Sequence, residues 1–215
     1  MIAPLVVYDY GEYDKLFASR DLKRAMKLFC RVAARLKMRY WIVGGSAVYL
    51  HVQNPPRDMP DIDVMLDVGK AAGLQFISAL SESGFDIDMV ERDAPEDVFA
   101  TLRYGSIWLD VFTSQESRPD MKRTVKVRGL DVEPVEPLLV EKAIRASYED
   151  ILMAVDLLAY ARYDVAILQQ TARRYRVWGR LALLSKVARS YKKGVLSAFD
   201  VCRFARMMAR GEGKL

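Results

Sequence analysis

Three aspartates in this chain have the spacing of a divalent-metal site. Asp61 and Asp63 flank Ile62 in the strand-like run DIDVMLDV, so their side chains share one face, about 7 Å apart. Asp110 lies in the apolar strand run SIWLDVF, where an unpaired carboxylate would be costly to bury. If the two strands are neighbours, three like charges gather, and hard divalent cations would relieve their repulsion. An isolated Asp-x-Asp also fits a solvated strand face; the combination predicts a metal site.

A glycine pair provides a second candidate element. Gly44 and Gly45 end the short apolar run YWIV, and Ser46 begins a segment, SAVYLHV, with helical character. A strand that enters a helix through glycine leaves backbone N–H groups where a phosphate can bind at close range, and the Ser46 hydroxyl can add a donor. Alone this is a weak signal, because a Gly-Gly turn between a strand and a helix also has a purely structural explanation.

The order of these elements resembles a known family. A Gly-Gly-Ser turn, then Asp61-x-Asp63, then a strand aspartate at position 110 is similar to the DNA polymerase β-type nucleotidyltransferase superfamily. In detail it looks closest to the small prokaryotic branch that includes the AbiEii-type toxin-like proteins. That branch carries an Arg-x-Thr-x-Asp-x-Asp segment, which here begins at Arg57 and has Met59 in place of the threonine. The motifs cover residues 38–115.

The resemblance implies a metal-dependent nucleotidyl transfer with Mg²⁺ or Mn²⁺ as cofactor. Asp61, Asp63 and Asp110 would be the catalytic metal ligands, and Asp110 would also help deprotonate the acceptor hydroxyl. Nucleotide binding is implied for the remaining motif residues. Of these, the glycine turn would hold the β- and γ-phosphates, and the two basic residues would offset negative charge. They are Gly44, Gly45, Ser46, Arg57 and Lys142, the last from a looser Leu-Leu-x-Glu-Lys match within residues 136–160.

The elements that must position these residues follow from apolar periodicity. Apolar residues at helical spacing predict a helix over 18–37, and glycine at position 84 predicts the end of another that begins near residue 70. Alternating runs predict strands, with a hairpin turn at Gly105-Ser106 and a further strand within 123–133. From Pro137 the pattern indicates three or four helices. We therefore expect an α/β (α+β) fold: a mixed-sheet nucleotidyltransferase-like domain at 1–135 and a basic helical domain at 136–215.

Positive charge is concentrated in the last part of the chain. Residues 171–215 hold 12 Lys or Arg against two acidic residues, a net charge of +10, while the other residues carry −5, giving +5 overall. Such a segment fits a nucleic-acid partner, RNA or tRNA, although a solvated helical face explains it equally well. The candidate nucleic-acid-binding residues are Arg173, Arg174, Arg176 and Arg180.

Composition favours a cytoplasmic globular protein. At 52% hydrophobic and 28% charged residues the chain is typical of that class, and no apolar run reaches the roughly 18 residues of a membrane span. The first residues lack the charge and cleavage pattern of a secretory signal. Cys30 and Cys202 lack metal or redox spacing and are expected to be free, buried thiols.

Three functions from different classes remain open. The first is an enzyme that moves a nucleoside monophosphate from a nucleoside triphosphate, ATP among the candidates, to a hydroxyl on RNA, protein or a small molecule. The second is an inactive member of the same fold that binds nucleotide or nucleic acid, for example in a toxin–antitoxin pair. The third is an assembly module whose basic helices face an acidic partner protein. If the nucleotide binds in reverse, the enzyme would transfer the γ-phosphoryl group instead.

Overall fold

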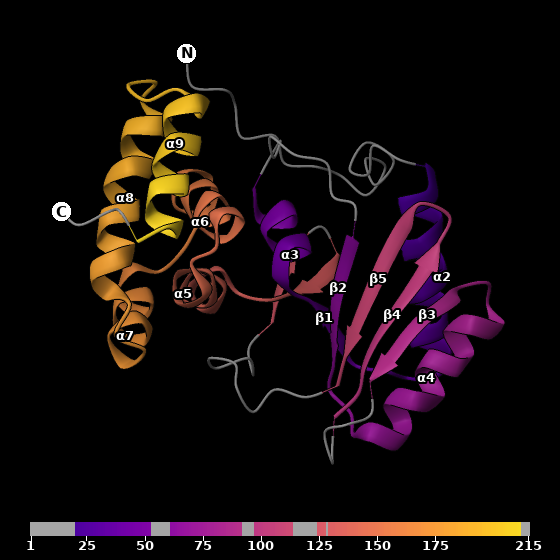
Figure 1. The fold of residues 1–215 in the computed structure, drawn as a ribbon. Helices are drawn as coiled ribbons and strands as arrows, with labels where there is room; N and C mark the ends of the chain where they lie inside the picture. The colour runs from indigo at the N-terminus through magenta and orange to yellow at the C-terminus, as the bar shows by residue number, and fades with distance from the viewer. Residues whose placement is uncertain (1–19, 53–60, 92–96, 114–123, 128, 212–215) are drawn as a thin grey trace. The chain divides into compact units, whose positions relative to one another are not determined.

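Alternating strands and helices give way to helices alone along this chain (Figure 1). The structure, a computed structural model, describes residues 20–52, 61–91, 97–113, 124–127 and 129–211. No helix in these ranges is both long and apolar enough to span a bilayer. In chain order the elements are α2 (Arg20–Arg35), β1 (Tyr40–Ile42), α3 (Gly44–His51), β2 (Asp61–Leu66), α4 (Lys70–Glu82), β3 (Asp86–Glu91), β4 (Phe99–Tyr104), β5 (Ile107–Phe112), β6 (Val125–Val127), β7 (Leu130–Val132), α5 (Val135–Arg145), α6 (Tyr148–Tyr160), α7 (Val165–Arg174), α8 (Trp178–Lys192) and α9 (Ala198–Ala209).

Within the described ranges the strands form one seven-stranded mixed sheet in the order β3-β4-β5-β2-β1-β7-β6. The pairs β3–β4 and β4–β5 are antiparallel, whereas β2–β5 and β1–β7 are parallel. The predicted hairpin is confirmed: Tyr104 pairs with Ile107, and Gly105 between them has φ +61°, a conformation that favours glycine. The single strand expected within 123–133 is instead two short strands, with Gly129 at φ +82° between them.

Contacts divide the chain into two compact units that do not follow a single cut at residue 135. The first comprises Met1–Trp41, Pro60–Ser114 and Lys126–Asp131, and the second comprises Ile42–Met59, Gln115–Val125 and Val132–Leu215. The second unit thus combines the glycine turn and α3 with the helices α5 to α9. The two domains expected from the sequence, 1–135 and 136–215, remain a prediction.

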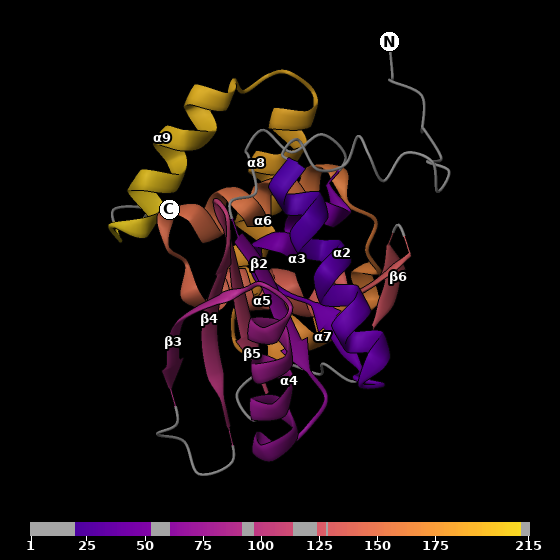
Figure 2. The same ribbon diagram turned by 90° about the vertical axis from the view of Figure 1, so that its right-hand side faces the viewer.

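In the first unit, α2 and α4 cover one face of the sheet. Figure 2 shows both helices in front of the strands, and Phe29 of α2 meets Phe76 of α4 edge-on, with ring centroids 5.5 Å apart. Gly73 allows α4 to approach closely, because a Cβ built there would lie 2.4 Å from Cγ2 of Thr113, just past β5. Ile62 and Val64 of β2 are buried at alternate positions, as are Ile107, Leu109 and Val111 of β5, so the residues between them lie on the opposite face of the sheet.

In the second unit, α6 is largely buried and contacts α5, α8 and α9, while α3 packs on α5 and α6. The described residues contain five helices after residue 135, so the expectation of three or four was wrong. Several breaks occur without glycine or proline: Ala146 adopts φ +50° and Arg176 adopts φ +59°. Helices α6, α7 and α9 begin at side-chain caps, since Ser147, Asp164 and Ser197 accept hydrogen bonds from backbone N–H groups, whereas α8 begins after Val177 without one.

Candidate active site

Two aspartates face each other across neighbouring strands of the first unit. In the parallel β2–β5 pair, Asp63 is the register partner of Asp110, and Asp61 is the partner of Trp108. Register partners on adjacent strands lie about 5 Å apart, and the two aspartates of β2 lie about 7 Å apart along it. All three aspartates are half-buried, while Ile62 between the first two is only 1% exposed. The topology therefore brings the three predicted carboxylates to one face of two adjacent strands.

A hydroxyl on the next strand holds the third aspartate. Thr101 of β4 is the register partner of Asp110, and its Oγ1 donates a 2.8 Å hydrogen bond to Oδ1 of that carboxylate. The row Thr101–Asp110–Asp63 thus crosses three strands on one face. Sequence reasoning missed Thr101, although the two-residue turn at Gly105-Ser106 fixes the hairpin register and makes position 101 oppose position 110.

The donor set can be tested against a divalent metal. Within the described ranges, no group of three or more His, Cys, Asp or Glu side chains is arranged to hold a metal ion. Mg²⁺, however, is commonly held by one or two carboxylates while water and substrate phosphate oxygens complete its shell. Asp63 and Asp110, opposed in register, supply such a pair, and Asp61 lies one alternation away on the same face. The chemistry of these donors therefore fits Mg²⁺ or Mn²⁺ together with a phosphate ligand.

The glycine turn belongs to the second unit. Helix α3 begins at Gly44 with φ +61°, a conformation that explains a glycine there. Its N-cap residue, Val43, offers no side-chain acceptor, and the Ser46 side chain is completely buried. The Val43 side chain therefore does not cap the first turn of α3. Anion binding at this turn stays a prediction. Arg57 lies outside the described residues.

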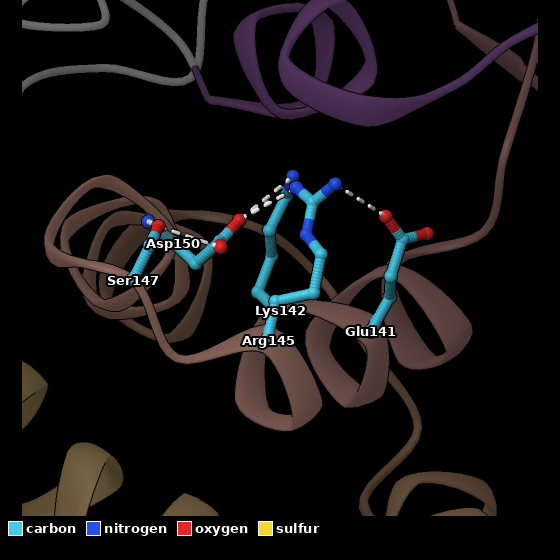
Figure 3. A network of polar contacts seen from close by, with 5 residues as sticks. All are labelled: Glu141, Lys142, Arg145, Ser147 and Asp150. Carbon is cyan, nitrogen blue, oxygen red and sulfur yellow. Dashed lines mark hydrogen bonds and ion pairs between the residues drawn. The ribbon is translucent and has the colours of Figure 1, made fainter. Parts of the chain in front are cut away.

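Lys142 lies in a buried ionic network on α5 and α6 (Figure 3). Its Nζ is 3.2 Å from Oδ1 of Asp150, and the two side chains are only 1% and 7% exposed. Arg145 donates to the same oxygen at 2.6 Å, and Ser147 donates to Oδ2 at 2.7 Å. Burial alone would raise the pKa of Asp150, but the hydrogen bonds from Ser147 and Arg145 and the charge of Lys142 outweigh it and lower the pKa. Lys142 therefore has a structural partner in addition to its predicted role.

His51, at the end of α3, is also held internally. Its Nε2 lies 2.7 Å from the carbonyl oxygen of Glu133. Burial lowers the pKa of His51, against the smaller opposing effects of that hydrogen bond and of Glu136. The ring is neutral at pH 7, and Nε2 carries the proton donated to the carbonyl. This histidine ties α3 to the segment before α5.

The predicted nucleic-acid-binding arginines are exposed on the helices of the second unit. Arg173 and Arg174 end α7, and Arg176 follows in the link to α8. Arg180, on α8, is exposed as well, but its guanidinium donates to the carbonyl oxygen of Ala143 in α5. Arg180 thus links α8 to α5. The other three arginines, Arg173, Arg174 and Arg176, remain the better candidates for binding a polyanion.

Comparisons with known proteins bear on this arrangement. No family model matches the chain, and no curated protein sequence matches it. Among solved structures, JHP933 from Helicobacter pylori has a TM-score of 0.50 at 10% identity, covering 91% of this chain and 94% of that one. A nucleotidyltransferase-like antigenic protein from Paracoccidioides brasiliensis has a TM-score of 0.47 at 18% identity, covering 79% and 94%. The lincosamide antibiotic adenylyltransferase LnuA has a TM-score of 0.48 at 17% identity, covering 62% and 94%.

At 10% identity the likeness to JHP933 bears on the fold alone, and it agrees with the expected mixed α/β fold. The nucleotidyltransferase type of that fold stays a prediction. The narrower resemblance to the AbiEii-type branch stays a prediction. So do the roles of the individual site residues.

Proposed function

We propose that this chain is a metal-dependent nucleotidyltransferase that moves a nucleoside monophosphate from a nucleoside triphosphate to a hydroxyl acceptor. The observation that carries the proposal is the register match of Asp63 with Asp110, with Asp61 on the same face. Carboxylate oxygens gathered on one face are ligands that divalent cations prefer, and such cations would offset the negative charge of the carboxylates and of a triphosphate. A fold does not determine a reaction, so the proposal depends on these residues, and the acceptor must be identified separately.

The reaction assigns a role to each candidate residue. The acceptor oxygen attacks the α-phosphorus and forms a new P–O bond, while the bond to the bridging oxygen breaks and pyrophosphate leaves. Asp110 accepts the acceptor's proton, and Thr101 fixes the orientation of its carboxylate through their hydrogen bond. Asp61 and Asp63, with Asp110, would hold Mg²⁺ or Mn²⁺, which supplies charge neutralisation to the triphosphate and acidifies the hydroxyl.

The β- and γ-phosphates would bind at the glycine turn. Support comes from Gly44, the first residue of α3, which has φ +61° and no Cβ to keep a phosphate away from the backbone. Arg57 and Lys142 would add positive charge. For Lys142 this requires the ammonium group to engage phosphate while it is still near Asp150, its ion-pair partner.

RNA or tRNA is the acceptor class that the charge distribution favours. Residues 171–215 carry a net charge of +10, and Arg173, Arg174 and Arg176 are exposed. The alternative to RNA is a hydroxyl on a protein, for example on an antitoxin or another partner protein in the cytoplasm.

An inactive, nucleotide-binding relative is the second candidate function. It is favoured by the pairing of Lys142 with Asp150, because a neutralised and buried ammonium group contributes less to a phosphate site than an accessible one. Only the active nucleotidyltransferase would convert nucleoside triphosphate to product; the inactive relative would bind the nucleotide without converting it.

The experiment that separates them measures pyrophosphate release. Each nucleoside triphosphate is mixed with Mg²⁺ or Mn²⁺, the full chain, and either total RNA or no added acceptor. We expect release that Asp61→Asn abolishes and Asp67→Asn retains, since Asp67 is an exposed carboxylate just past β2, ion-paired with Arg39. Metal-dependent nucleotide binding without release in any mixture would favour the inactive relative.

A further inference from the structure

A large aromatic side chain lies exposed beside the carboxylates. On the face of β2, β5 and β4 that carries Asp61, register partners form a second row, Asp61–Trp108–Arg103, next to the row that contains Asp110. Trp108 is 37% exposed, although indole rings are normally well buried. A polar residue could occupy this surface position equally well, so an exposed tryptophan here suggests that its ring binds a ligand.

The indole is held by a neighbouring cation. The guanidinium carbon of Arg103 lies over the Trp108 ring, 5.9 Å from its centroid. This cation–π contact restricts the orientation of the ring while a substantial part of it remains exposed. A pre-oriented aromatic surface loses little conformational entropy when a flat ligand stacks on it.

The third row on the same face makes a useful contrast. Phe112 of β5 stacks on Phe99 of β4 with ring centroids 4.9 Å apart, and the register partner of Phe112 on β2 is the buried Met65. Those aromatic rings already have aromatic or apolar partners within the sheet. Of the aromatic side chains on β5, Trp108 is the more exposed and is therefore the better platform for a ligand.

Its distance from the proposed chemistry fits a nucleoside. Trp108 precedes Asp110 by two positions on one strand, a separation of about 7 Å. Across the strand pair it is the partner of Asp61. A phosphate held at the carboxylates would thus leave an attached nucleoside within reach of the indole ring.

We infer that Trp108, oriented by Arg103, is a stacking platform for a nucleobase. The inference deepens the proposed function and rests on it for the location of the phosphate. The base belongs either to the nucleoside triphosphate or to the end of an RNA acceptor, and the chemistry is the same for both. Every base has a π-face that stacks on an aromatic side chain, and the nearby guanidinium complements the negative charge of the attached phosphates.

Equilibrium binding tests this without requiring turnover. Affinities of ATP, GTP, CTP, UTP, inorganic triphosphate and a short single-stranded RNA are measured in the presence of Mg²⁺ for the wild type and for Trp108→Leu. We expect Trp108→Leu to weaken one base-containing class about tenfold and to leave inorganic triphosphate unchanged. Trp108→Phe, which retains a ring, should restore most of the lost affinity. Trp178→Phe, a tryptophan at the start of α8, is the matched control and should have no effect.

The pattern of loss identifies the source of the base. Weaker binding of the nucleoside triphosphates places the substrate base on Trp108, whereas weaker binding of the RNA alone places the acceptor base there. Equal affinity of Trp108→Leu and the wild type for every base-containing ligand would overturn the inference, as would an equal loss for inorganic triphosphate. Arg103→Gln provides a second variant and should weaken the same ligand class to a smaller extent.

These outcomes are separable from those of the proposed function. If the wild type releases no pyrophosphate but Trp108→Leu loses base-dependent binding, the platform stands and the transferase proposal fails. If pyrophosphate is released and the affinities are insensitive to Trp108, the transferase proposal stands and the platform fails.

Discussion

Asp63 and Asp110 are register partners on the parallel strands β2 and β5, so two carboxylates lie side by side on one face of the sheet. Like charges this close repel each other, and a bound cation would reduce that repulsion. Both side chains are half-buried, which strengthens the repulsion relative to a fully solvated pair.

This relationship predicts a metal-linked stability. Addition of Mg²⁺ and a nucleoside triphosphate should raise the melting temperature of the wild type, by an amount equivalent to about 2.7 kcal/mol at 100 times the dissociation constant. Asp63→Asn should abolish the rise, because it removes one ligand charge; the melting temperature of each variant without added metal is the baseline. Differential scanning fluorimetry measures both quantities. A rise that persists in Asp63→Asn but disappears in Asp67→Asn would contradict the assignment.

Thr101 should act through Asp110. Removal of its hydroxyl in Thr101→Val deletes the 2.8 Å hydrogen bond and should cost about 1 kcal/mol of unfolding free energy. Activity or metal affinity should fall about 10- to 100-fold, as is usual when the partner of a metal ligand is removed. Thr101→Ser keeps the hydroxyl and is the control, to be compared by denaturant unfolding and by pyrophosphate release. Equal activity of the two variants would assign Thr101 to packing.

His51 should make the stability depend on pH. It is the chain's single histidine, and burial holds its pKa below the ordinary value of about 6.5. The unfolded chain therefore binds a proton at a higher pH than the folded chain, so unfolding free energy should fall as the pH drops below about 6.5 and level off below the folded pKa. His51→Gln can keep a donor to the Glu133 carbonyl without titrating. Urea unfolding at pH 7.5 and 5.5 should show a smaller difference for His51→Gln than for the wild type; an equal difference would exclude His51 as the titrating group.

The basic helices should bind RNA with strong salt dependence. Each phosphate contact contributes a log–log slope of roughly −0.7 to −0.9. Replacing Arg173, Arg174 and Arg176 together by glutamine should flatten the slope for a tRNA or single-stranded RNA. The control replaces three exposed arginines of α2, Arg24, Arg31 and Arg35, which changes the net charge equally. If the control triple variant flattens the slope as much, net charge rather than the α7–α8 region determines binding.

Much of the candidate site followed from local sequence patterns. Alternation identified β2 and β5, and the two-residue turn at Gly105 joined β4 to β5 in register. The parallel pairing of β2 with β5 could only be assumed, because the strands are separated by α4 and two further strands and no local residue determines which edges meet.

The helical part was less predictable, because its breaks occur at ordinary residues. Ala146 favours helix intrinsically, yet it adopts φ +50° and lets Ser147 cap α6. This break brings Asp150 back to Lys142, eight residues earlier in the sequence, into a buried ion pair that helical spacing alone would not reveal. A Ser-x-x-Asp pattern at Ser147 was the available signal.

The most direct test follows the α-phosphate. The full chain is supplied with nucleoside triphosphate labelled at either the α or the γ position, with Mg²⁺ or Mn²⁺ and total RNA, and label in macromolecules is measured. We predict that only α label is transferred, that Asp110→Asn abolishes the transfer, and that Asp67→Asn retains it. Transfer of γ label alone would establish phosphoryl transfer instead, and α transfer that survives Asp110→Asn would contradict the role of the paired carboxylates.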